Sequence, residues 1–197
     1  MELPSAIDVS SVVGLIAVGI LTAQILLGLL LSVGYNPLRQ FPHRRLKLFT
    51  FHNWLGYIGL SAAIVHVSIL LLVPSKSGGS LFRLFDVLVP IWSPVQPIPN
   101  TLGAIAFYLV LFVVLTSYFR KVFGRHRWKQ LHYVAYAAAI VFYVHGTWAD
   151  PLLTNRFPDF IDAEKAYVEG CGLLVLAATI WRFRYGKSRR PNPVPAY

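Results

Sequence analysis

The chain has little charge and almost no cysteine for its length. Charged residues make up 13% of its 197 residues, whereas 56% are hydrophobic. A soluble domain of this size needs a far more polar surface, so the composition predicts an integral membrane protein in contact with a lipid bilayer. Cys171 is the single cysteine. This excludes an intramolecular disulfide, a cysteine-ligated iron–sulfur cluster and covalent haem attachment through C-x-x-C-H.

Acidic residues are also scarce, with eight Asp and Glu against eighteen Lys and Arg and a formal net charge of +10. Fourteen of the eighteen cations lie in three short segments, 39–47, 120–129 and 182–190. These segments alternate along the chain with loops that hold few cations. The positive-inside rule therefore places them in the cytoplasm, with the N-terminus outside and the C-terminus inside. Orientation and anionic lipids explain the charge, so we expect no nucleic-acid partner.

No G-x-G-x-x-G motif of a flavin or nicotinamide domain occurs in the sequence. Five apolar stretches predict an all-α membrane protein, a bundle of about five transmembrane helices, at residues 11–33, 51–73, 101–118, 131–148 and 166–181. We expect one membrane domain over residues 1–197 that ends in a basic cytoplasmic tail, 182–197. The longest connection, 74–100, is expected to include a short amphipathic helix on the outer membrane surface.

Four histidines lie within two of these stretches. His52 and His66 are fourteen residues apart, and His132 and His145 are thirteen apart. Imidazole within a bilayer is costly and normally has a bound partner or a transport task. Fourteen helical residues fall about 40° short of four turns and rise about 21 Å, so the first pair shares a face at opposite ends of the hydrocarbon layer. Thirteen residues fall about 140° short, which requires curvature, local tightening or approach from different flanks.

Haem iron takes axial histidines, so this arrangement predicts two b-type haems, each held by one histidine from each helix. Both helices run from the cytoplasm to the outside in the predicted topology. Matching by depth therefore pairs His52 with His132 on the inner side and His66 with His145 on the outer side. Small residues on the same helix faces would admit a flat macrocycle: Gly56, Gly59, Ala63, Ala135, Ala138 and Ala139. An alternative is that these small residues only let helices pack together.

The spacings His52-x13-His66 and His132-x12-His145 resemble those of the ferric reductase-like transmembrane domain of ferric reductases and NADPH oxidases. There, two helices carry H-x13-H and H-x12-H and bind two haems. The segment TSYFRKVFGRHRWKQLHYVAYAAAIVFYVH is also similar to the haem-binding membrane subunit of the periplasmic methionine-sulfoxide reductase system. The likeness covers roughly residues 46–181.

This resemblance implies a diheme cytochrome b in the bacterial inner membrane that passes electrons to an outer acceptor. It is expected to be an electron-transfer subunit of a transmembrane oxidoreductase, with no catalytic residue assigned. Many family members have six helices and a fused flavin domain, whereas here we count five helices and find no such domain. Electrons are therefore expected from a separate flavoprotein or from quinol, within an assembly of several subunits.

Cations in the basic segments are candidate partners of the haem propionates. Arg44, Arg45 and Arg127 are assigned this role because guanidinium matches carboxylate geometry, although lipid headgroups explain them equally well. Three other functions remain open. The chain can be a quinol-oxidising cytochrome b subunit of a larger respiratory or photosynthetic complex, with quinone as a further cofactor. It can instead be a haem-free transporter that uses buried histidines, or a structural subunit that keeps its haems without redox turnover.

Overall fold

The computed structural model describes residues 5–34, 47–76, 78–89, 91–149 and 162–188. Within these ranges the regular secondary structure is all helical, apart from one isolated β-bridge between Pro74 and Ser80. The helices are α1 (Ala6–Ser32), α2 (Leu48–Leu70), α3 (Leu84–Leu88), α4 (Pro97–Tyr118), α5 (Arg120–His132), α6 (Val134–Trp148) and α7 (Ala163–Ser188). The prediction of an all-α chain is therefore confirmed for the described residues.

Four of the helices are long and apolar enough to cross a membrane. They are α1, α2, α4 and the part of α7 from Ala163 to Arg184, and they correspond to four of the five predicted spans. The remaining predicted span, 131–148, is divided between two helices. Its first two residues belong to α5, and α6 is apolar but has only 15 residues. That is shorter than the roughly 20 residues which a helix needs to span a bilayer alone.

The basic segment 120–129, which the sequence analysis treats as a loop, is helical instead. It forms most of α5, with a sharp turn at Gly124, where φ is 72° and ψ is 162°. A residue without a Cβ adopts this backbone conformation readily. The segment is helical elsewhere because its Arg and Lys residues have high helix propensity.

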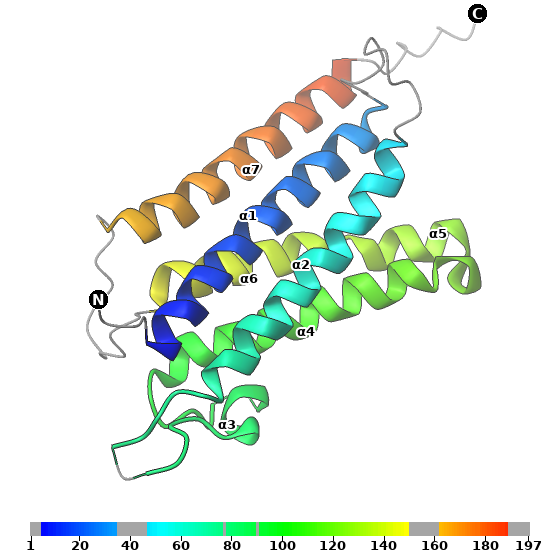
Figure 1. Ribbon diagram of the computed structural model, residues 1–197. Coiled ribbons are helices and arrows are strands. Elements are labelled where there is room, and N and C mark those ends of the chain that lie inside the picture. The colour runs from blue at the N-terminus through cyan, green and yellow to red at the C-terminus, as the bar shows by residue number, and fades with distance from the viewer. Residues whose placement is uncertain (1–4, 35–46, 77, 90, 150–161, 189–197) are drawn as a thin grey trace, which may run out of the picture.

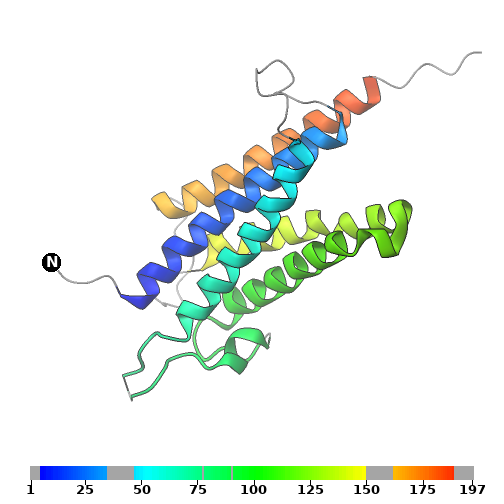
Figure 2. The ribbon, with the colours of Figure 1, turned by 45° about the vertical axis from the view of Figure 1, so that its right-hand side comes forward.

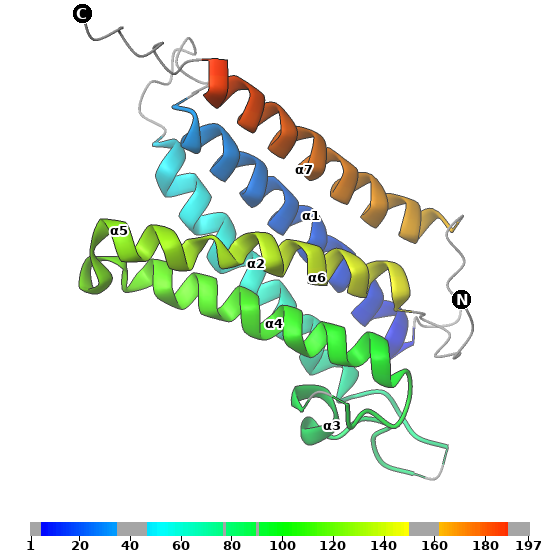
Figure 3. The ribbon, with the colours of Figure 1, turned by 180° about the vertical axis from the view of Figure 1, so that it is seen from behind.

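The helices form two layers, seen from opposite sides in Figures 1 and 3. In one layer α1 lies between α2 and α7 and packs against both. In the other layer α4 lies beside the α5–α6 segment, as Figure 2 also shows. The α1–α2 contact is the most extensive, and glycines on α2 make it close. Gly56 faces Gln24, and Gly59 faces Leu21.

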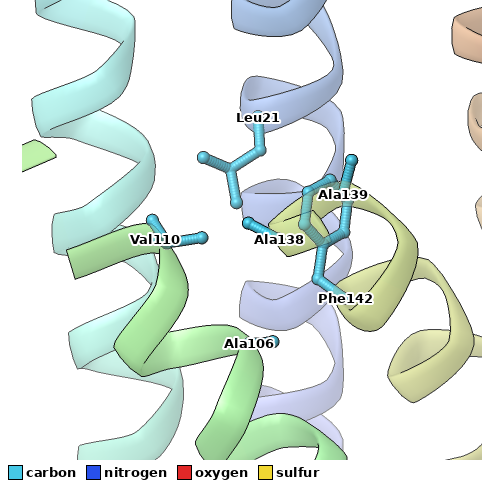
Figure 4. Close-up of a cluster of buried hydrophobic side chains, with 6 residues drawn as sticks. All are labelled: Leu21, Ala106, Val110, Ala138, Ala139 and Phe142. Carbon is cyan, nitrogen blue, oxygen red and sulfur yellow. The ribbon is translucent and has the colours of Figure 1, made fainter. Parts of the chain in front are cut away.

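A cluster of buried apolar side chains joins the two layers (Figure 4). It consists of Leu21 from α1, Ala106 and Val110 from α4, and Ala138, Ala139 and Phe142 from α6. Large apolar side chains on the outward faces, including Ile16, Ile64 and Leu173, are exposed. Such a surface is unfavourable in water but suits a helix bundle surrounded by lipid.

The long connection between α2 and α4 contains the short helix that the sequence predicts there. This helix, α3, has five residues, and the hydroxyl of Tyr108 on α4 donates a 2.6 Å hydrogen bond to the carbonyl of Leu88 at its end. Leu84, Phe85 and Trp92 are exposed in this connection. Its placement on the membrane surface stays a prediction.

The α1–α2 contact can be tested at Gly59. A Cβ there would lie 2.7 Å from Leu21 Cδ2, whereas a Cβ at Gly170 of α7 would meet nothing within 4 Å. We expect Gly59→Leu to lower the free energy of unfolding in detergent by about 1–3 kcal/mol, because overpacking displaces a buried side chain. Gly170→Leu should be neutral or slightly stabilising, since leucine is the better helix former. Equal effects of the two substitutions on the unfolding midpoint would contradict this packing.

Candidate functional site

The four histidines of the predicted spans meet in two pairs toward opposite ends of the bundle. The rings of His52 on α2 and His132 on α5 have centres 6.2 Å apart and planes inclined by 70°. The rings of His66 on α2 and His145 on α6 have centres 6.4 Å apart and planes inclined by 67°. The structure therefore brings together the same residues that the sequence analysis pairs by depth.

The separation of the rings fits one metal ion between the members of each pair. Two imidazoles on opposite sides of a metal, with bonds of about 2 Å and ring centres about 1 Å behind the bonding nitrogens, have ring centres about 6 Å apart. The described residues contain no group of three or more His, Cys, Asp or Glu side chains that could hold a metal ion. Each pair offers only two protein ligands, so a bound group that brings its own equatorial ligands, such as a porphyrin, fits the donor set.

In three of the four histidines, a hydrogen bond to a main-chain carbonyl determines which ring nitrogen is free to bind a metal. Each donates from Nδ1 to a carbonyl of a neighbouring helix: His52 to Gln24 (2.9 Å), His66 to Ser10 (2.8 Å) and His145 to Pro99 (2.8 Å). A carbonyl oxygen only accepts, so Nδ1 carries the proton and Nε2 keeps its lone pair. Metal-binding histidines commonly have this arrangement, which orients the ring and raises its basicity.

His132 is oriented differently from the other three histidines. Its Nδ1 lies 3.2 Å from the hydroxyl oxygen of Ser117, which also accepts a 3.4 Å hydrogen bond from the indole N–H of Trp128. The indole ring lies beside the imidazole, with ring centres 5.2 Å apart. A hydroxyl can donate or accept, so this contact orients the ring without setting its tautomer.

The thirteen-residue spacing is accommodated by a break between α5 and α6. Tyr133 lies at this break, and its N–H donates to the carbonyl of Gln130 three residues earlier. The N–H of Tyr136 donates in turn to the carbonyl of Tyr133. Bonds of this i→i+3 type tighten a helix to about three residues per turn and so add rotation. This added rotation reduces the shortfall from four full turns, so His132 and His145 come closer to sharing one helix face.

Glycines from neighbouring helices make room for three of the histidine rings. A Cβ at Gly14 would lie 3.1 Å from the His66 ring, and one at Gly28 would lie 3.1 Å from the His52 ring. A Cβ at Gly103 would lie 2.8 Å from His145. The sequence analysis missed these three glycines. A signal was present, because Gly14 and Gly28 are fourteen residues apart, like the two histidines that they face.

Each histidine pair lines a cavity. The outer cavity, at His66 and His145, has a volume of about 190 Å³, and the inner cavity, at His52 and His132, has a volume of about 530 Å³. The side chains that line both cavities, and therefore lie between them, are Leu21, Val110 and Phe142 (Figure 4). This apolar partition keeps the two sites separate.

The small residues named from the sequence occupy different positions. Gly56 lines the inner cavity and Ala63 lines the outer one. Gly59 lines neither, because Leu21 lies against it. Among the alanines of the second pair, Ala135 and Ala138 line the inner cavity.

Of the three arginines assigned to propionates, the structure describes Arg127. Arg127 is exposed and lines neither cavity, and Arg44 and Arg45 lie outside the described residues. Three other cations line the inner cavity: Arg125, Lys129 and Arg182. Sequence reasoning did not single them out, because a charge in a basic segment carries no signal of the direction in which it points.

Arg182 is the cation that the structure holds most firmly at the inner cavity. Its Nε donates a 2.7 Å hydrogen bond to the hydroxyl of Ser32 on α1, and its Nη1 donates a 3.0 Å bond to the hydroxyl of Tyr136 on α6. These two bonds leave further N–H donors of the guanidinium for an anion in the cavity.

One of three comparisons with known proteins finds a match. Residues 13–143 match the family described as Ferric reductase like transmembrane component. The match includes His52, His66 and His132, and it ends two residues before His145. Neither the comparison with curated proteins nor that with solved structures gives a match. Because the family match covers well over half of the chain, this membrane protein belongs to the ferric reductase-like transmembrane component family, whose domains generally bind haem and whose presence indicates electron transfer across a membrane.

Proposed function

We propose that the chain is a diheme b-type cytochrome that carries electrons across the membrane. The observation that carries the proposal is the pair of histidine contacts, with ring centres 6.2 and 6.4 Å apart at opposite ends of one bundle. The Nδ1 hydrogen bonds of His52, His66 and His145 support it, because they leave Nε2 as the ligand atom. Two haems would supply one reversible one-electron couple near each membrane surface.

The chain's own residues determine how such couples would work. His52 with His132 and His66 with His145 would each hold one haem, which would supply one-electron chemistry. An outer acceptor or a docked partner protein would then receive the electron without binding between the histidines. Leu21, Val110 and Phe142 exclude water between the two cavities and leave only a short apolar partition for an electron to cross.

We further propose five membrane crossings, with the α5–α6 segment as the fourth and the N-terminus outside. The basic segments support this orientation. Helix α5 and the end of α7 lie at the same end of the bundle (Figure 1), and Arg125, Lys129 and Arg182 from these segments line the inner cavity. The guanidinium of Arg120 lies 4.5 Å from the ring centre of Phe49 at the start of α2, which places that helix start at the same end. The positive-inside rule assigns this end to the cytoplasm.

The proposed donor is a flavoprotein or quinol on the cytoplasmic side of a bacterial inner membrane. In the quinol case the chain would be the cytochrome b subunit of a larger respiratory complex.

Sealed vesicles that contain the purified chain test electron transfer across the membrane. With an impermeant reductant outside and trapped ferricyanide inside, the purified chain should oxidise the reductant at the expense of ferricyanide, and a His66→Ala chain should not. Equal rates for the two chains would contradict transfer through both sites.

The proposal also predicts the haem content of the chain. The purified chain should show a reduced-minus-oxidised α-band of b-type haem and two haems per polypeptide in a pyridine haemochrome assay. A colourless protein from cells supplied with ample haem would contradict the proposal and favour the transporter.

The second prediction concerns the pairing of the ligands. His52→Ala and His132→Ala should each remove the inner haem, because either substitution leaves that site with one histidine. His66→Ala and His145→Ala should each remove the outer haem. The haem content per chain should fall from two to one in every variant. The haem that remains in the His52 and His132 variants should differ in α-band and midpoint potential from the haem that remains in the His66 and His145 variants. Loss of both haems from every folded single variant would contradict the assigned pairs.

The third prediction concerns the glycines of α1. Gly28→Leu should displace the His52 ring and weaken the inner haem selectively, whereas Gly14→Leu should displace His66 and weaken the outer one. Redox titration of each variant separates the two sites. Gly170→Leu is the matched control, since a side chain there meets nothing within 4 Å. An unchanged haem content and unchanged potentials in both α1 variants would contradict this role.

A further inference from the structure

One lysine is buried beside the outer cavity. Lys165 lies in the first turn of α7 and is only 7% exposed. It lines the same cavity as His66 and His145. A buried ammonium is costly unless an opposite charge or several hydrogen bonds compensate for its lost hydration.

The packing of α7 explains why this side chain points inward. Val168, one turn further along, is 1% exposed and lies against Gly146, the residue after His145. Gly172, another turn along, lies against the ring of Tyr143. Residues spaced by three or four share one face of a helix, so Lys165 belongs to the face of α7 that is turned toward α6 and the cavity.

No described side chain neutralises this charge. Among the described residues, no hydrogen bond or ion pair to Lys165 is present, and the neighbouring carboxylate of Glu164 accepts a 3.2 Å hydrogen bond from Ser11 instead. Glu164 also lines this cavity, but it forms no ion pair with Lys165, because consecutive residues on a helix do not face each other. The first-turn N–H groups of α7 add a partial positive charge at the same place. Lys165 is therefore a cation on the wall of the outer cavity, where it is available to an anion that enters the cavity.

We propose that Lys165 binds a propionate carboxylate of the haem held by His66 and His145. This inference rests on the proposed function. A carboxylate on the porphyrin edge supplies the missing opposite charge, while the remainder of the macrocycle occupies the apolar part of the cavity. Lys165 thereby has at the outer site the role that Arg125, Lys129 and Arg182 are placed to take at the inner one.

A chemical double-mutant cycle tests the proposal. In a His52→Ala background that keeps only the outer site, haem-depleted protein is titrated with haem and with haem dimethyl ester, whose propionates are uncharged. The chain with Lys165 intact should bind haem about tenfold or more tightly than the ester, because a charge-assisted contact is lost. Lys165→Met should bind the two equally, and Lys165→Arg should keep the preference. Lys76→Met, at an exposed lysine of the connection before α3, is the matched control and should keep it too.

The midpoint potential is a second readout. It should fall in Lys165→Met and stay unchanged in Lys76→Met, because a nearby cation favours the reduced haem. Equal binding of haem and ester when Lys165 is intact would overturn the inference, as would a preference that persists in Lys165→Met. Excess acetate that lowers haem and ester binding alike would indicate a site for free carboxylates and would also overturn it. Failure of the unsubstituted chain to bind any haem would instead refute the proposed function.

Discussion

In α1, Gly14 and Gly28 lie directly against the histidine rings of α2, and this close contact of antiparallel helices positions both sites. It brings the carbonyls of Ser10 and Gln24 within hydrogen-bond distance of the rings. A larger residue at either glycine would separate the helices and remove the bond that orients Nε2. Helix packing and ligand orientation thus have one physical origin, the absence of a Cβ at two positions.

The apolar partition between the cavities gives the bundle a second function besides stability. Leu21, Val110 and Phe142 come from three different helices and join the two layers. The same side chains lie between the two proposed haem sites, where a polar path would conduct protons as well as electrons. The low-dielectric interior also strengthens charge interactions at each cavity, so a single cation there has a larger effect than it would in water.

The two ends of the molecule differ in charge. Arg125, Lys129 and Arg182 line the inner cavity, and two hydroxyl groups hold the last of these in place. Lys165 lines the outer cavity, close to a carboxylate that Ser11 engages. Charges near a cofactor tune its potential, so unequal charge at the two ends would let the two proposed haems differ in potential.

Much of this protein could be predicted from its sequence. Long apolar stretches determine membrane helices, because a backbone in lipid must satisfy its own hydrogen bonds. The histidine spacings, read as helical rotation and rise, identify the pairs that the structure brings together. The sequence analysis missed the helix at 120–129, although its helix propensity is a local property. The positions of Arg125, Lys129, Arg182 and Lys165 could not be predicted. Such features depend on contacts between helices distant in sequence, and no periodicity within one helix reveals what faces it. Only tertiary packing decided that Gly59 meets Leu21 while Gly14 and Gly28 meet the histidines, because the steric fit of two surfaces is a property of the pair.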